Sequence, residues 1–220
     1  MNTTYTPDRV PAPIPWKIGE HIAAVGDTGT GKTYLVSELL RARKYVVVFR
    51  TKPDDIKFPG FKKVRKAEAM DDVYASRLLL TPAYERQSWE GWHALERVWR
   101  QGNWTVVIDE LWYAEKIGLK EPIERLLTQG RSKGISVVIG MQRPAQISRF
   151  AISQCTHLFT FRVDGRDADT IKLATTPRII PAIESLQGHD FAYYHRSKRI
   201  VTTGNARRLG ELVRIPREGT

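Results

Sequence analysis

The chain has 220 residues and a mass of 25.1 kDa, the size of one α/β domain, and 41% of its residues are hydrophobic. Its apolar runs fall far short of the roughly 20 residues that cross a bilayer, its start lacks the apolar core of a secretion signal, and its single cysteine, Cys155, excludes an intramolecular disulfide. Lys and Arg number 35 against 24 Asp and Glu, a net charge of +11 that favours a polyanionic partner such as nucleic acid.

Short β-rich runs alternate with helical patterns along most of the chain. Residues 1–18 contain four prolines and are expected to form an extended N-terminal arm. The predicted strands are residues 21–25, 45–49, 77–80, 105–108, 135–139 and 157–162, followed by a hairpin of 191–194 with 200–203. The predicted helices are residues 32–43, 88–101, 121–129, 145–152 and 166–174. This order predicts an α/β domain over residues 19–204, with a mainly parallel central sheet flanked by helices, and a basic C-terminal tail over 205–220.

The predicted helix 88–101 carries aromatic residues at helical spacing. Trp92, Leu95 and Trp99 recur on one face, which favours a helix that packs on the sheet. The alternative is an aromatic platform for nucleic acid.

Residues 26–33 match the phosphate-binding pattern G-x-x-x-x-G-K-[ST]. They follow an apolar strand and open a helix, which is the setting that the motif requires. Glycines in this loop allow a tight curl whose N–H groups bind phosphate oxygens, whereas a turn without a ligand is the alternative. Lys32 is expected to reach the β- and γ-phosphates, and the Thr33 hydroxyl to bind Mg²⁺. The predicted nucleotide-binding residues are Gly26, Asp27, Thr28, Gly29, Thr30, Gly31, Lys32, Thr33 and Tyr34.

An acidic pair follows the apolar strand 105–108, as in a Walker B motif. Asp109 is predicted to hold the magnesium shell, and Glu110 to polarise an attacking water. Capping of a following helix is the alternative role for such a pair. A kinase transfers phosphate to a bound acceptor and need not activate water, so the pair favours hydrolysis. No guanine-reading Asn-Lys-x-Asp pattern occurs, so the predicted cofactors are ATP and Mg²⁺.

Residues 129–144 contain an Arg-x-x-Gly segment, an apolar strand and Gln-Arg-Pro. With the P-loop and the acidic strand, this segment resembles the FtsK and HerA superfamily of DNA-pumping ATPases, over about residues 20–165. The resemblance implies a RecA/ASCE-like P-loop NTPase fold. It also implies that Gln142 senses the γ-phosphate and that Arg131 is an arginine finger for an adjacent subunit. Arg143, Arg149 and Arg162 are the alternatives for the finger.

In size and architecture the chain resembles the compact genome-packaging ATPases of double-stranded DNA viruses with an internal membrane. This resemblance implies an ATP-hydrolysing motor that translocates double-stranded DNA. The implied partners are double-stranded DNA and further copies of the chain in a pentameric or hexameric ring, with capsid or internal-membrane proteins of a virion as further candidates. The implied location is the virion or the host cytoplasm.

Other functions remain open from the sequence. One is an assembly ATPase of the Zot type, which exports filamentous phage. The others are a small-molecule kinase and a nucleotide-gated binding protein that barely hydrolyses.

Several basic clusters are candidate DNA contacts, although each one alone is more often a solvated surface. These clusters are residues 62–66, residues 196–199, Arg207, Arg208, Arg214 and Arg217.

Overall fold

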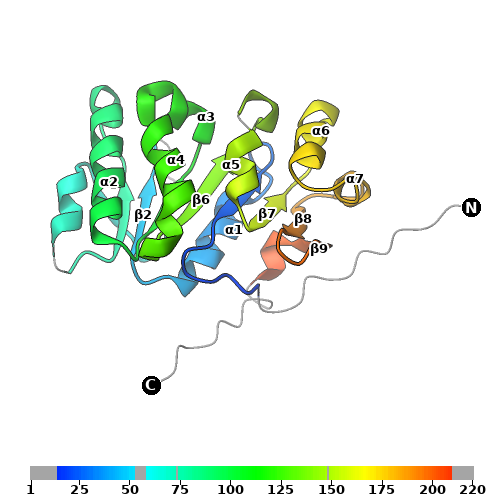
Figure 1. Ribbon diagram of the computed structural model, residues 1–220, viewed down its shortest axis with the longest axis horizontal. Helices are drawn as coiled ribbons and strands as arrows, with labels where there is room; N and C mark the ends of the chain where they lie inside the picture. Colours follow the sequence, from blue (N-terminus) through cyan, green and yellow to red (C-terminus); the bar gives the residue numbers. More distant parts are fainter. Residues whose placement is uncertain (1–13, 53–57, 73, 148, 210–220) are drawn as a thin grey trace, which may run out of the picture. The chain divides into compact units, whose positions relative to one another are not determined.

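The computed structural model describes residues 14–52, 58–72, 74–147 and 149–209 (Figure 1). Their contacts group them into two compact units. The P-loop unit comprises residues 14–16, 23–42, 142–147 and 149–209, and the Asp109 unit comprises residues 17–22, 43–52, 58–72 and 74–141. Most of the predicted N-terminal arm (1–18) and of the basic tail (205–220) lies outside the described residues, so these boundaries stay predictions.

The Asp109 unit is built on five parallel strands. Their order is β3 (Lys62–Val64), β4 (Arg77–Leu80), β2 (Val46–Phe49), β5 (Thr105–Ile108) and β6 (Ser136–Met141). The inner strands are almost entirely buried runs of branched apolar residues, as expected where helices cover a parallel sheet. In the register, Phe49 lies opposite Ile108 and Ile108 opposite Ile139. The residues that follow β2 and β5 therefore leave the sheet next to each other.

One helix connects β4 to β5, and two helical segments connect β5 to β6. They are α2 (Gln87–Gln101), α3 (Leu111–Ala114) with the π-helical turn η4 (Glu115–Leu119), and α4 (Lys120–Gln129). Short 3-10 turns are η2 (Ala67–Asp71), η3 (Tyr84–Arg86) and η5 (Gly130–Lys133). Helices α2 and α4 lie side by side in Figure 1. The predicted helices 88–101 and 121–129 are thus confirmed to within one residue.

The buried face of α2 matches the predicted one in part. Leu95 is buried as predicted, together with Gly91, Ala94 and Val98, and Trp99 is half-buried. Trp92 is 38% exposed, so its predicted place on the buried face is wrong. At about 100° per residue, Trp92 lies roughly a third of a turn from the centre of the buried face. A Cβ at position 91 would lie 2.5 Å from Cδ1 of Leu119 and 2.9 Å from Cζ of Phe49, so a larger residue there would have to displace the ends of these side chains.

The P-loop unit contains four strands in the order β1 (Ile22–Val25), β7 (His157–Thr160), β8 (Asp190–His195) and β9 (Ile200–Asn205). The first residue of β1, Ile22, belongs to the Asp109 unit. The antiparallel pairing of β8 with β9 confirms the predicted hairpin. The helices are α1 (Lys32–Leu39), α5 (Arg149–Gln154), α6 (Gly165–Ala174) and α7 (Ile179–Glu184), with 3-10 turns η1 (Leu40–Ala42), η6 (Pro144–Gln146) and η7 (Ala206–Arg208). Phe159, Phe161 and Phe191 pack edge to face in the core.

The predicted fold class, a mainly parallel α/β sheet flanked by helices, is confirmed. Three helices or strands were not predicted: β3, which lies within the basic segment 62–66, the short helix α3, and α7, which contains a proline. None of the helices in the described part of the chain is long and apolar enough to span a membrane.

His21 is a buried imidazole in the Asp109 unit. Its Nδ1 accepts the N–H of Val137 at 3.0 Å, which ties it to β6. Burial is the main cause that lowers the pKa of His21 from 6.5 to about 4, and the positive charge of Arg131 adds to this effect.

We expect this histidine to make stability depend on pH. Because its pKa is lower in the folded chain, protons bind preferentially to the unfolded chain as the pH falls. Neutral His21 therefore contributes roughly 3 kcal/mol to the free energy of unfolding above about pH 6.5. This contribution is lost as the pH falls from about 6.5 to about 4. NMR titration should place the His21 midpoint near 4, and the free energy of unfolding of His21→Gln should lack this part of the pH dependence. A midpoint near the ordinary value would contradict the assignment.

Candidate nucleotide site

The P-loop, residues 26–33, connects β1 to α1. The N–H and hydroxyl of Thr30 both donate to the carbonyl of Asp27, at 3.4 and 2.8 Å, and close the turn. A Cβ at Gly26 would lie 2.6 Å from the Cβ of Phe161, and Gly31 has a φ of 108°. Side chains at these two positions would clash or strain the backbone. The curl therefore depends on the glycines of the motif.

The start of α1 suits an anion. Its N-cap, Gly31, provides no side-chain cap, and the first turn contains no acidic residue, so its amide groups retain the partial positive charge of a helix N-terminus. The ammonium of Lys32 donates to the carbonyls of Gly26 and Asp27, which places this charge over the same loop. Both features fit phosphate oxygens.

The remaining predicted P-loop residues differ in exposure. Asp27, Thr28 and Tyr34 are exposed. Within the described residues, the half-buried Thr33 hydroxyl has no hydrogen-bond partner, so its oxygen is available to a magnesium ion. A residue not predicted, His189, places Nδ1 3.1 Å from the carbonyl oxygen of Thr30. No sequence pattern marks His189 as part of the site, and this contact between residues far apart in sequence is what identifies it.

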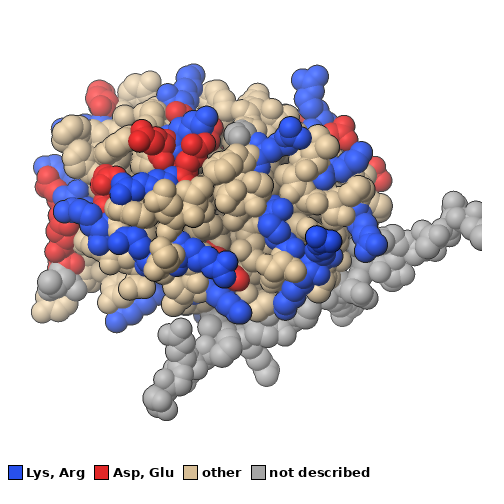
Figure 2. Space-filling view, viewed as in Figure 1, with Lys and Arg blue, Asp and Glu red and all other residues tan. Residues whose placement is uncertain are grey.

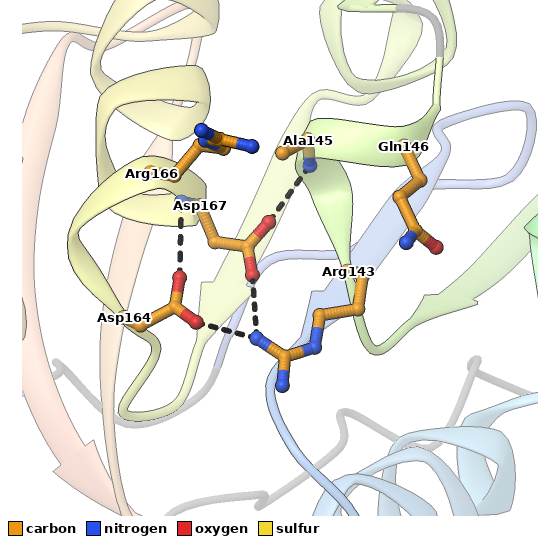
Figure 3. A pocket seen from close by; sticks show the side chains of 6 residues that line it. All are labelled: Arg143, Ala145, Gln146, Asp164, Arg166 and Asp167. Carbon is orange, nitrogen blue, oxygen red and sulfur yellow. Dashed lines mark hydrogen bonds and ion pairs between the residues drawn. The ribbon is translucent and has the colours of Figure 1, made fainter.

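Gln142 is the residue directly after β6, and it is half-buried. The loop that it begins is tied to α6 through Arg143, whose Nη1 donates to the carboxylates of Asp164 and Asp167 (Figure 3). Asp167 also accepts the N–H of Ala145 at 2.8 Å, and Asp164 caps α6. The loop is thereby anchored within its own unit.

The same ion pairs determine how well Arg143 could serve as the arginine finger. The hydrogen bond and charge of Asp164 raise the pKa of Arg143, with smaller contributions from Asp27 and Asp167. Arg143, Asp164 and Asp167 border a cavity of about 400 Å³ that is also lined by Ala145, Gln146 and Arg166 (Figure 3). Because Arg143 is engaged with two carboxylates, it is the least suitable of the four candidate fingers.

The acidic pair follows β5 in the Asp109 unit. Oδ2 of Asp109 accepts a hydrogen bond from Nη1 of Arg50 at 2.8 Å, and Nζ of Lys52 lies 3.9 Å from Oε2 of Glu110. The two carboxylate side chains are 18% and 12% exposed, so both are largely shielded yet reachable.

The acidic pair also fits a magnesium ion. Among the described residues nothing donates to Oδ1 of Asp109, which leaves this oxygen for a metal or for its bound water. The described part of the chain has no cluster of three or more metal-binding side chains. Mg²⁺ bound to a nucleotide typically takes one or two protein oxygens and completes its shell with phosphate and water. Asp109 and, in the other unit, Thr33 each offer an oxygen of the kind that this ion takes.

Gly140 in β6 is a further residue that was not predicted as part of the site. A Cβ at this position would lie 2.2 Å from the carbonyl oxygen of Asp109. A glycine within an apolar strand often marks such a close approach of backbones. Gly140 thus lets β6 approach the main chain at Asp109.

Arg131 lies in η5 and is exposed. Its stem packs against Gly19, and its guanidinium makes no hydrogen bond with any described residue. Arg149 and Arg162 are also exposed. The structure therefore leaves Arg131 accessible to another molecule, and its role stays a prediction.

A glycine loop at the start of a helix and an acidic pair after a buried parallel strand define the class of P-loop NTPases. No family model matches the chain. However, it is 31% identical to the DNA packaging ATPase P9 of Enterobacteria phage PRD1, and the match covers 70% of this chain and 69% of P9. The chain belongs to this family of phage DNA-packaging ATPases. The predicted resemblance to viral genome-packaging ATPases is thereby confirmed.

Solved structures agree in fold. The genome packaging NTPase B204 of Sulfolobus turreted icosahedral virus 2, in complex with ATP-gammaS, is similar with a TM-score of 0.70 and 15% identity, covering 86% of this chain and 98% of B204. The plasmid coupling protein TrwB, in complex with a GTP analogue, is similar with a TM-score of 0.59 and 12% identity, covering 90% of this chain and 88% of TrwB. At these identities the two structures support the P-loop NTPase fold alone.

We predict that Gly140→Ala lowers both stability and ATPase activity. The added methyl group forces β6 away from Asp109, which we expect to cost about 1–3 kcal/mol and, by displacing the carboxylate, up to about 100-fold in turnover. Gly165→Ala is the control, because a Cβ there meets nothing within 4 Å. Thermal unfolding and ATPase assays measure the two effects, and a Gly140→Ala variant equal to wild type in both would refute the close approach.

Proposed function

We propose that this protein is the ATP-hydrolysing motor that moves double-stranded DNA during packaging of a viral genome. The observation that carries the proposal is the partly shielded pair Asp109 and Glu110, placed directly after a buried parallel strand in a chain that also has a complete P-loop. Family membership supports the direction of the proposal, because P9 is named as a DNA packaging ATPase.

Each site residue has a distinct part in this proposal. The amides of the P-loop and the Lys32 ammonium bind the phosphates of ATP, and Thr33 and Asp109 hold Mg²⁺. The magnesium ion, when bound, neutralises charge on the β- and γ-phosphates. Glu110 orients a water for attack and accepts its proton. Gln142 responds to the γ-phosphate, and its anchored loop transmits that state to α6.

Glu110→Gln tests the hydrolytic role. The amide keeps the size of the side chain but cannot accept a proton, so we expect ATPase activity stimulated by double-stranded DNA to fall by about 10²- to 10⁴-fold while ATP binding persists. Glu121→Gln is a matched control on the exposed side of α4. A Glu110→Gln variant as active as wild type would remove Glu110 from its role. ATPase activity that ignores DNA would favour an assembly ATPase.

A ring of subunits follows from the proposed finger. If Arg131 completes the site of a neighbouring copy, subunits must assemble head to tail, and closure gives a ring such as a pentamer or hexamer. We include capsid or internal-membrane proteins of the virion as candidate partners, and the virion or host cytoplasm as the location.

Mixing two inactive variants tests the finger. Arg131→Ala should lower turnover by about 10³-fold or more, and Lys32→Ala should abolish phosphate binding. In a mixed ring, some sites combine an intact P-loop with an intact Arg131 from the neighbour, so activity should partly return. Mass measurement with ATP and DNA should detect a closed ring. Recovery with Arg149→Ala or Arg162→Ala in place of Arg131→Ala would move the finger to that residue, and a fully active monomer would exclude it.

The structure reduces the set of candidate DNA-binding residues only in part. Basic side chains are spread over the face shown in Figure 2, with acidic ones between them. The candidate segment 62–66 presents four exposed cations, Lys62, Lys63, Arg65 and Lys66. In contrast, Arg196 donates to the carbonyls of Ile152, Cys155 and Ala174, so it holds the fold together. Arg214 and Arg217 lie outside the described residues.

A further inference from the structure

The segment that follows β2 makes a series of contacts around the acidic pair. Arg50 and Lys52 form ion pairs with Asp109 and Glu110, and the carbonyl of Thr51 between them accepts a hydrogen bond from Gln87. This segment was not predicted to belong to the site.

Arg50 is fixed in place on several sides. Its backbone N–H donates to the carbonyl of Leu80 at 3.0 Å, and its side chain is only 2% exposed. The parallel register sets Phe49 opposite Ile108, so Arg50 and Asp109 leave neighbouring strands at the same level. A guanidinium buried to this degree is costly unless it is paired with an anion and hydrogen-bonded. Arg50 therefore depends in part on the carboxylate of Asp109, alongside its other contacts.

The dependence also runs in the other direction. Nη1 of Arg50 holds Oδ2 of Asp109 at 2.8 Å, which restricts rotation of the carboxylate and leaves Oδ1 as the oxygen for the metal shell. Partners of this kind, which orient a metal-binding group without touching the metal, commonly change metal affinity or activity by about 10- to 100-fold when removed.

Gln87 fixes the segment after β2 to the helix after the acidic pair. This buried side chain donates through Nε2 to the carbonyl of Thr51 at 3.0 Å and accepts through Oε1 from the hydroxyl of Tyr113 at 2.9 Å. Tyr113 lies in α3, which begins at the residue after Glu110. Both ends of the acidic pair are thus tied to the end of β2.

We propose that Arg50 is a positioning residue for ATP hydrolysis, which orients the Asp109 carboxylate for magnesium and is itself kept in place by the Thr51–Gln87–Tyr113 contacts. The inference rests on the proposed function, because it assumes that Asp109 serves the metal. Arg50 touches neither nucleotide nor metal in this role.

The test measures how ATPase activity depends on the magnesium concentration. Arg50→Gln should raise the concentration needed for half-maximal activity and lower kcat, with a combined loss of about 10- to 100-fold. Arg50→Lys retains the charge and should lose less in both quantities. Arg77→Gln is the matched control, since Arg77 is a half-buried arginine on the neighbouring strand β4, at the end where it lies opposite Val46. Nucleotide binding without magnesium and thermal unfolding are measured in parallel.

The outcomes separate the inference from the proposed function. A shifted magnesium dependence in Asp109→Asn and Arg50→Gln, but not in Arg77→Gln, supports the inference. A shift in Asp109→Asn with wild-type behaviour in Arg50→Gln overturns the inference but not the proposed function. A lower magnesium concentration for half-maximal activity in Arg50→Gln also overturns the inference, because it would mean that Arg50 competes with the ion. No shift in Asp109→Asn overturns the metal role of Asp109 and the inference with it. If Arg50→Gln fails to fold, Arg50→Lys decides: a shift in the same direction supports the inference, and none overturns it.

Discussion

The constraint on which the site depends is the immobilisation of Asp109 at the carboxyl-terminal end of the inner strand β5. Its N–H donates to the carbonyl of Phe49, its own carbonyl lies against Gly140, and its carboxylate is held by Arg50. These three contacts come from the strands on either side of β5. Hence the position of the acidic pair is a property of the sheet register, and no single loop determines it.

The P-loop obtains its properties in a different way. Its shape comes from residues adjacent in sequence, because glycines permit the curl and α1 supplies uncapped amides at its start. The Lys32 ammonium rests on carbonyls of the same loop, so a phosphate that replaces them finds a charge already in place. Because these contacts are local, the motif can be recognised in a sequence. Triphosphate binding alone, however, is shared by kinases, switches and motors.

The difference between local and long-range contacts also explains how much could be predicted. The P-loop, the acidic pair and most strands follow from short patterns, and the structure contains them close to the expected residues. Arg50, Gln87, Gly140 and His189 acquire their importance from partners 26 to 159 residues away in sequence, and no local pattern marks them. Trp92 shows the converse error, because aromatic spacing alone did not identify the face of α2 that is buried. Similarly, Arg196 was a candidate for DNA until its carbonyl partners were known.

The central claim is that the P-loop and the acidic pair together serve one magnesium-bound ATP. A crystal structure of the protein with Mg²⁺ and a slowly hydrolysed ATP analogue tests it most directly. We expect the triphosphate to be bound by the amides of residues 29–33 and Lys32, and a single magnesium ion to contact the Thr33 hydroxyl and to reach Asp109 directly or through water. A nucleotide bound away from the P-loop, or a magnesium ion that contacts neither Thr33 nor Asp109, would contradict the account.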